Sequence, residues 1–137
     1  MLIDYVKKYY DKEYNLNCAE TIIYAANENY NLNLDKNTLK SMAAFGGGMA
    51  IGSVCGAITG ALAVLGIIFV RDKAHESSKI KELSMEFFNR FQSVFHEKNC
   101  IELKEKFANY EERCSKMVYT AAEILEQLIE EYRVKNI

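Results

Sequence analysis

The chain has no proline among its 137 residues, only two histidines and no Cys-x-x-Cys pair. Without proline, no position is closed to a helix by a missing backbone N–H or by the proline ring. Without Cys-x-x-Cys, neither a thioredoxin-like motif nor a common zinc knuckle is present. Charge of one sign is lacking as well, because 17 basic residues and 19 acidic ones leave a net charge of −2. This balance excludes nucleic acid as an expected partner.

Half of the residues are hydrophobic, which suits one compact domain over residues 1–137. Residues 1–8 lack the basic start, apolar core and cleavage site of a secretory signal, so we expect a cytoplasmic protein. In that compartment the four cysteines are expected to be reduced. Their use would then be catalysis, redox sensing or metal binding rather than structural disulfides.

No charged residue occurs between Ser41 and Val70, so a transmembrane helix has to be considered. Three consecutive glycines at residues 46–48 interrupt this stretch. The amphipathic segments on both sides need an apolar partner to cover. We therefore expect no membrane span and predict a buried central helix over about residues 53–70.

Apolar residues recur at three- and four-residue intervals through most of the chain, and no segment alternates with period two. The pattern predicts an all-α fold, a single-domain bundle of about six to seven helices around the buried Gly-rich central helix. The expected helices cover residues 2–14, 18–30, 35–45, 53–70, 73–99, 100–107 and 110–133.

Gly52, Gly56 and Gly60 are spaced four residues apart and are expected on one face of the central helix. Glycines in this spacing let another backbone approach closely. The neighbour is expected to be a helix of the same chain or of a second subunit, which makes a homodimer one of the predicted arrangements.

Three of the four cysteines, Cys18, Cys55 and Cys100, are predicted to open helices, and Cys114 to lie one turn inside the last one. Asn-Cys-x-Glu at residues 17–20 and again at 99–102 predicts two capping boxes. A helix N-terminus stabilises a thiolate and so lowers the pKa of a cysteine. The same position suits a metal or cluster ligand, and the sequence does not separate the two uses.

The segment Phe45-Gly-Gly-Gly-Met-Ala-Ile-Gly-Ser-Val-Cys-Gly-Ala-Ile-Thr-Gly60 joins a glycine run to a Cys-Gly-Ala-x-x-Gly core. Cys18 precedes it, and two isolated cysteines, Cys100 and Cys114, follow it. With these motifs the chain resembles the C_GCAxxG_C_C family of redox-active proteins over nearly its whole length. The resemblance implies a small helical protein, found mainly in anaerobic bacteria and archaea, with redox activity at the cysteines and no established substrate or cofactor.

The first functional hypothesis is a thiol-based oxidoreductase or redox carrier, in which one thiolate attacks and another cysteine resolves the intermediate. Its candidate catalytic residues are Cys18, Cys55, Cys100 and Cys114. We expect Cys55 to attack, because the helix N-terminus should lower its pKa. No Gly-Lys-Ser/Thr follows the glycines, so a phosphate loop is not predicted. Backbone approach of a cofactor near Cys55 is expected at Gly46, Gly47, Gly48 and Gly56.

Two further hypotheses stay open. In the second, all four cysteines are ligands of a metal ion or an iron–sulfur cluster, and electron transfer belongs to that group. In the third, the chain is a structural or partner-binding helical protein with inert thiols. The sequence leaves open whether the protein is an enzyme, which redox partner it uses and which cofactor it holds.

Overall fold

Seven α-helices make up most of residues 1–134, the part of the chain that the structure, a computed structural model, describes. They are α1 (Leu2–Tyr10), α2 (Cys18–Asn29), α3 (Lys36–Lys40), α4 (Gly56–Phe69), α5 (Ser78–Phe95), α6 (Cys100–Phe107) and α7 (Ser115–Val134). The described residues contain no strand, only two isolated bridges that pair Val54 with Asn99 and Asn109 with Arg113. The predicted all-α bundle is confirmed.

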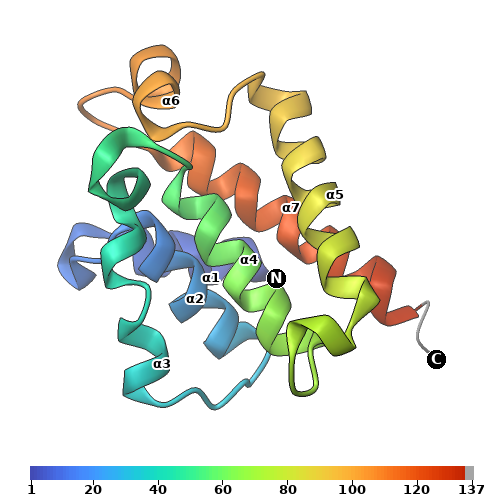
Figure 1. Ribbon diagram of the computed structural model, residues 1–137. Coiled ribbons are helices and arrows are strands. Elements are labelled where there is room, and N and C mark those ends of the chain that lie inside the picture. Colours follow the sequence, from blue (N-terminus) through green and yellow to red (C-terminus); the bar gives the residue numbers. More distant parts are fainter. Residues whose placement is uncertain (135–137) are drawn as a thin grey trace.

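Helix α4 is the buried centre of the bundle (Figure 1). Helix α2 packs on one side of it, and α5 and α7 pack on the other (Figure 1). The helix begins at Gly56 rather than near residue 53, because Ser53 and Val54 pair with the chain around Asn99 instead. None of the helices in residues 1–134 combines the length and the apolar character that crossing a membrane requires.

Two glycines of α4 let the backbone of α2 lie directly against it. A Cβ atom on Gly60 would stand 2.7 Å from the carbonyl oxygen of Ala19, and one on Gly56 would stand 3.2 Å from the Ala19 nitrogen. Gly52, which was expected on the same face, lies outside the helix and next to Ile101. The glycine face is thus covered by α2 of the same chain, and it gives no support to a homodimer.

Several helices end earlier than their apolar patterns predict. Helix α1 stops at Tyr10, and the short 3-10 turn Lys12–Tyr14 is followed by Asn15, which is left-handed with φ 53°. Helix α5 stops at Phe95, because His96 is left-handed with φ 57°. Residues 35–45 divide into α3 and a separate 3-10 turn. An apolar repeat identifies the buried face of a helix but not the residue at which the backbone leaves it.

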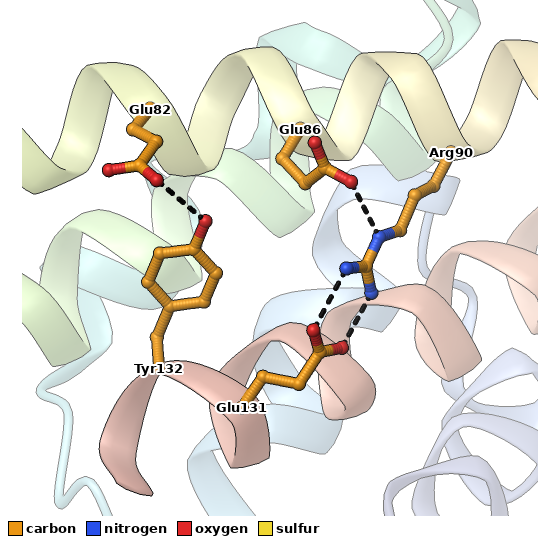
Figure 2. Close-up of polar contacts among 5 residues, drawn as sticks. All are labelled: Glu82, Glu86, Arg90, Glu131 and Tyr132. Atoms are coloured by element: carbon orange, nitrogen blue, oxygen red, sulfur yellow. Dashed lines mark hydrogen bonds and ion pairs between the residues drawn. The ribbon is translucent and has the colours of Figure 1, made fainter. Parts of the chain in front are cut away.

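Polar contacts fasten α5 to α7 (Figure 2). Arg90 on α5 donates to both carboxylate oxygens of Glu131 on α7, at 2.7 and 2.9 Å, and its Nε donates to Glu86 one turn away at 2.9 Å. The hydroxyl of Tyr132 donates to a carboxylate oxygen of Glu82 at 3.1 Å. These contacts fix the two helices relative to each other without involving any cysteine.

Candidate functional site

The fold brings all four cysteines to one pocket of about 400 Å³. Cys18 and Cys100 are the first residues of α2 and α6. Cys55 and Cys114 directly precede α4 and α7, so the prediction that Cys114 lies one turn inside its helix is wrong. Four helix N-termini therefore meet at the pocket. A helix N-terminus carries partial positive charge, which favours an anion such as a thiolate.

The start of α2 holds Cys18 through the predicted capping box, which is confirmed. The side chain of Asn17 accepts a hydrogen bond from the Glu20 amide at 2.8 Å, and the Glu20 carboxylate accepts one from the Asn17 amide at 3.1 Å. The Asn17 side chain also donates to the carbonyl of Ala43 at 2.9 Å. This last bond fastens the chain before the glycine run to the helix that carries Cys18.

Cys55 and Cys100 directly follow Val54 and Asn99, the two residues that pair in a short β-bridge. The Cys55 amide donates to the carbonyl of Lys98 at 2.9 Å, and the Cys100 amide donates to the carbonyl of Ser53 at 2.6 Å. The capping box predicted at residues 99–102 is wrong, because the Asn99 side chain makes no capping hydrogen bond. The bridge, rather than a cap, sets the start of α6.

The glycine run forms a left-handed turn that precedes the Val54–Asn99 bridge in the chain. Residues 47–50 all have φ between 62° and 65°, and two of them are not glycine. Each non-glycine residue in this conformation costs about 1–2 kcal/mol. The turn closes where the Ser53 amide donates to the Gly48 carbonyl at 3.1 Å, and a Cβ on Gly48 would stand 2.9 Å from the Cβ of Cys100. The strained turn thus packs directly on a cysteine of the pocket.

Cys114 is positioned by a tight turn and by the end of α1. Arg113 pairs with Asn109 across the turn and is itself left-handed, with φ 53°. The Cys114 amide donates to the hydroxyl of Tyr10 at 2.9 Å. The guanidinium of Arg113 donates to the Tyr10 carbonyl at 2.7 Å and stands 4.2 Å from the centre of the Tyr10 ring. One tyrosine therefore holds both the cysteine and the cation beside it.

The pKa values of Cys18 and Cys114 depend on each other. The hydrogen bond from Cys18 lowers the pKa of Cys114 from an ordinary value of 9.0 to about 6, against burial and with help from the charges of Lys104 and Arg113. The same hydrogen bond, together with burial, holds the pKa of Cys18 well above its ordinary value. The pair shares one proton, which stays on Cys18 near neutral pH while Cys114 is ionised.

The other two thiols are harder to ionise. Burial raises the pKa of Cys55 to about 11, although hydrogen bonds from the amides of Ala57 and Ile58 act in the opposite direction. Burial also raises the pKa of Cys100, partly offset by the neighbouring charge of Lys104. The prediction that a helix N-terminus lowers the pKa of Cys55 is wrong, because desolvation outweighs the helix amides at a thiol that is only 5% exposed.

Comparison with known proteins identifies the family. Residues 16–128 match the family described as "Putative redox-active protein (C_GCAxxG_C_C)". The chain belongs to the C_GCAxxG_C_C family. The matched part of the chain contains all four cysteines, and the resemblance seen in the sequence is confirmed. No curated protein and no solved structure matches the chain.

The glycines of this C_GCAxxG_C_C chain differ in what they do at the pocket. Gly47 and Gly56 line it, whereas Gly46 and Gly48 do not. A Cβ on Gly46 would stand 2.6 Å from the Asn17 side chain, so this glycine serves packing. Of these four glycines, only Gly47 is open, because a Cβ atom there would have nothing within 4 Å. Backbone approach of a cofactor at these glycines stays a prediction.

Among the pocket residues of this C_GCAxxG_C_C protein that were missed from the sequence, three lie beside the cysteines with polar or charged groups: Tyr10, Lys104 and Arg113. Lys104 follows Cys100 by four residues on one helix, and that spacing could have identified it. Arg113 is the direct neighbour of Cys114. Tyr10 gives no local signal, because its role depends on where α1 ends against the start of α7.

The metal hypothesis is tested by how the side chains are grouped. Within residues 1–134, no three His, Cys, Asp or Glu side chains stand close enough together to hold one metal ion. A structural zinc ion would require four such ligands in a tetrahedron. The described arrangement of the C_GCAxxG_C_C cysteines therefore does not fit a four-cysteine site for a single ion. An iron–sulfur cluster at these residues stays a prediction.

Proposed function

We propose that the protein is a thiol–disulfide oxidoreductase or redox carrier in which Cys114 attacks and Cys18 resolves. The observation that carries this proposal is the placement of Cys18 and Cys114 in one pocket with Lys104 and Arg113, where the pKa of Cys114 is lowered to about 6. A thiolate is the nucleophile in thiol–disulfide exchange, and a thiol with a pKa near the ambient pH is the best attacking group.

In the first step the Cys114 thiolate attacks one sulfur of a disulfide substrate. A bond forms between the Cys114 sulfur and that sulfur, the substrate S–S bond breaks, and the other substrate sulfur leaves with the electron pair as a thiolate. Tyr10 holds the backbone of Cys114 in place through its hydroxyl, 2.9 Å from the Cys114 nitrogen. Burial keeps this phenol protonated, because it raises the pKa of Tyr10 to about 12.

In the second step Cys18 releases the bound half of the substrate. The hydrogen bond to Cys114 is the largest cause of the raised pKa of Cys18, and it disappears once the Cys114 sulfur is no longer a thiolate. Cys18 then loses its proton more easily and attacks the Cys114 sulfur. The second substrate sulfur leaves and takes up that proton. The first substrate thiolate takes up a proton from water, so the substrate disulfide has become two thiols and the protein has gained a disulfide. An external dithiol is needed to reduce the protein again.

Cys55 and Cys100 form a second dithiol in this proposal. The β-bridge between Val54 and Asn99 holds the backbones of the two cysteines next to each other. Their raised pKa values make them slower nucleophiles than Cys114. They are proposed to oxidise after the first pair, which would let the protein carry four electrons. The setting proposed for this chemistry is a reducing compartment such as the cytoplasm, where free thiols are the resting state.

A trapping experiment tests the assignment. Cys18→Ser should accumulate a mixed disulfide between Cys114 and a small disulfide such as 2-hydroxyethyl disulfide, because no thiol remains to resolve it. Cys114→Ser should form little mixed disulfide at its three remaining cysteines at neutral pH. Intact mass and peptide mapping identify the adduct, and the native protein, which can resolve it, serves as the control.

Two results would contradict the proposal. An adduct that forms on Cys55 in the Cys18→Ser protein would move the attacking role back to that residue. Slow, equal alkylation of all four cysteines would favour the inert-thiol hypothesis. A cluster would show as added iron and sulfide mass after anaerobic purification, lost when the cysteines are substituted together.

A further inference from the structure

The pocket that holds the four cysteines is positively charged. Lys104 and Arg113 line it, and none of its lining residues in the described part of the chain is Asp or Glu. With the Cys114 thiolate included, two positive charges face one negative charge. The reduced pocket therefore carries an excess of one positive charge, in addition to the partial charges of four helix N-termini.

Neither cation has a carboxylate partner within residues 1–134. Lys104 is exposed, and its charge acts to lower the pKa of Cys100. Arg113 donates to the neutral carbonyl of Tyr10 and lies on its ring. Both side chains thus keep N–H donors and charge available at the pocket, where an anion would satisfy them.

The pocket is also small, and most of its wall is apolar. A volume of about 400 Å³ suits a low-molecular-weight compound rather than a folded domain. Cys55 and Cys100 are 5% and 8% exposed, and Cys18 and Cys114 are partly buried. A substrate must therefore enter the pocket to bring its sulfur to Cys114.

We propose that the substrate is a small disulfide that carries carboxylates, bound with a carboxylate at Lys104 and Arg113 and with its disulfide at Cys114. This inference rests on the proposed function, because it assumes that Cys114 is the attacking group. The attack moves the negative charge from Cys114 onto the leaving sulfur, so the two cations that stabilise the first thiolate also stabilise the second.

The test compares three disulfides of similar size and different charge: dithiodiglycolate, a dianion; 2-hydroxyethyl disulfide, which is neutral; and cystamine, a dication. An isolated thiolate repels the dianion and attracts the dication. The pocket should reverse this order and react with dithiodiglycolate at least about 10-fold faster than with cystamine at low ionic strength. Added salt should reduce the ratio, because screening acts on exposed charges.

Lys104→Gln should reduce the ratio of the two rate constants several-fold toward one, and Arg113→Gln should do the same. The ratio is the proper readout because the thiolate fraction of Cys114, which these variants also change, divides out. Lys81→Gln is the matched control, since Lys81 is an exposed lysine on α5 that does not line the pocket. Its ratio should equal that of the native protein.

The outcomes separate this inference from the proposed function. A native protein that reacts with cystamine as fast as with dithiodiglycolate, with the adduct still on Cys114, would overturn the anionic substrate and leave the oxidoreductase in place. An unchanged ratio in Lys104→Gln would overturn the assignment of that lysine. No adduct on Cys114 with any of the three disulfides would overturn both proposals.

Discussion

The lowered pKa of Cys114 predicts an unusual pH profile for its reactivity. The assay is alkylation of the fully reduced protein by iodoacetamide, with the label on each cysteine counted by peptide mass spectrometry. Only the thiolate reacts, so the rate at Cys114 follows its ionised fraction. Because the profile is measured on one residue, differences in access between the four cysteines do not enter.

The expected magnitude follows from the two pKa values. At about pH 5.5, a thiol with a pKa of about 6 is roughly one-quarter ionised, whereas one with a pKa of 9.0 is ionised to roughly 3 parts in 10,000. Between about pH 5.5 and pH 10 the rate at Cys114 should therefore rise only about 4-fold. An ordinary cysteine in a peptide should rise about 3,000-fold over the same range.

Two substitutions at Cys18 separate the hydrogen bond from the other causes. A hydrogen bond to a charged group is worth about 1.5–3 kcal/mol, and 1.36 kcal/mol corresponds to one pH unit. Cys18→Ala removes the donor and should raise the pKa of Cys114 by about one to two pH units, so its rate rises roughly 30- to 300-fold across the range. Cys18→Ser keeps a hydroxyl donor and should retain a shallow profile.

The reasoning is refuted if Cys114 in the native protein follows the steep profile of an ordinary thiol. It is also refuted if Cys18→Ala and Cys18→Ser give the same profile, because the hydrogen bond would then have no part in the pKa. A shallow profile at Cys55 would contradict the statement that burial dominates at that residue.

Three further predictions concern the packing that positions the site. Gly60→Ala should lower the free energy of unfolding by about 1–3 kcal/mol in a urea titration, because its Cβ would meet the α2 backbone at 2.7 Å. Gly66→Ala is the matched control: it has open space around it and should raise the free energy of unfolding by about 0.5–1 kcal/mol. Equal effects at the two glycines would contradict the close approach. Tyr10→Phe should cost about 1–2 kcal/mol and speed hydrogen exchange at the Cys114 amide, which loses its acceptor; an unchanged exchange rate would speak against this contact. Arg90→Gln should cost less than about 1 kcal/mol, since its partners are partly exposed, and should leave every cysteine reactivity unchanged.

Much of the fold follows from local patterns in the sequence. The apolar repeat identifies α4 as the buried helix, and the Asn-Cys-x-Glu pattern correctly caps α2 because a capping box needs only four consecutive residues. The same pattern fails at residues 99–102, where the amide of Cys100 finds the carbonyl of Ser53 instead. A local rule holds as long as no distant backbone group competes for the same hydrogen bond.

The chemistry of the site could be predicted only in part. That the four cysteines share a site follows from their number and from the family resemblance. The pairing of Cys18 with Cys114 does not, because residues far apart in the sequence meet only through the packing of α1, α2 and α7. The pKa of Cys55 shows the same limit: a helix start predicts a low value, but burial, which depends on the whole fold, raises it.

The order in which the cysteines pair tests the central claim most directly. The reduced protein would receive one equivalent of a small disulfide under anaerobic conditions, then be quenched with an alkylating agent and mapped by peptide mass spectrometry. We predict that the first bridge joins Cys18 to Cys114, with Cys55 and Cys100 recovered as alkylated thiols. A first bridge between Cys55 and Cys100, or bridges spread over all pairs, would contradict the account.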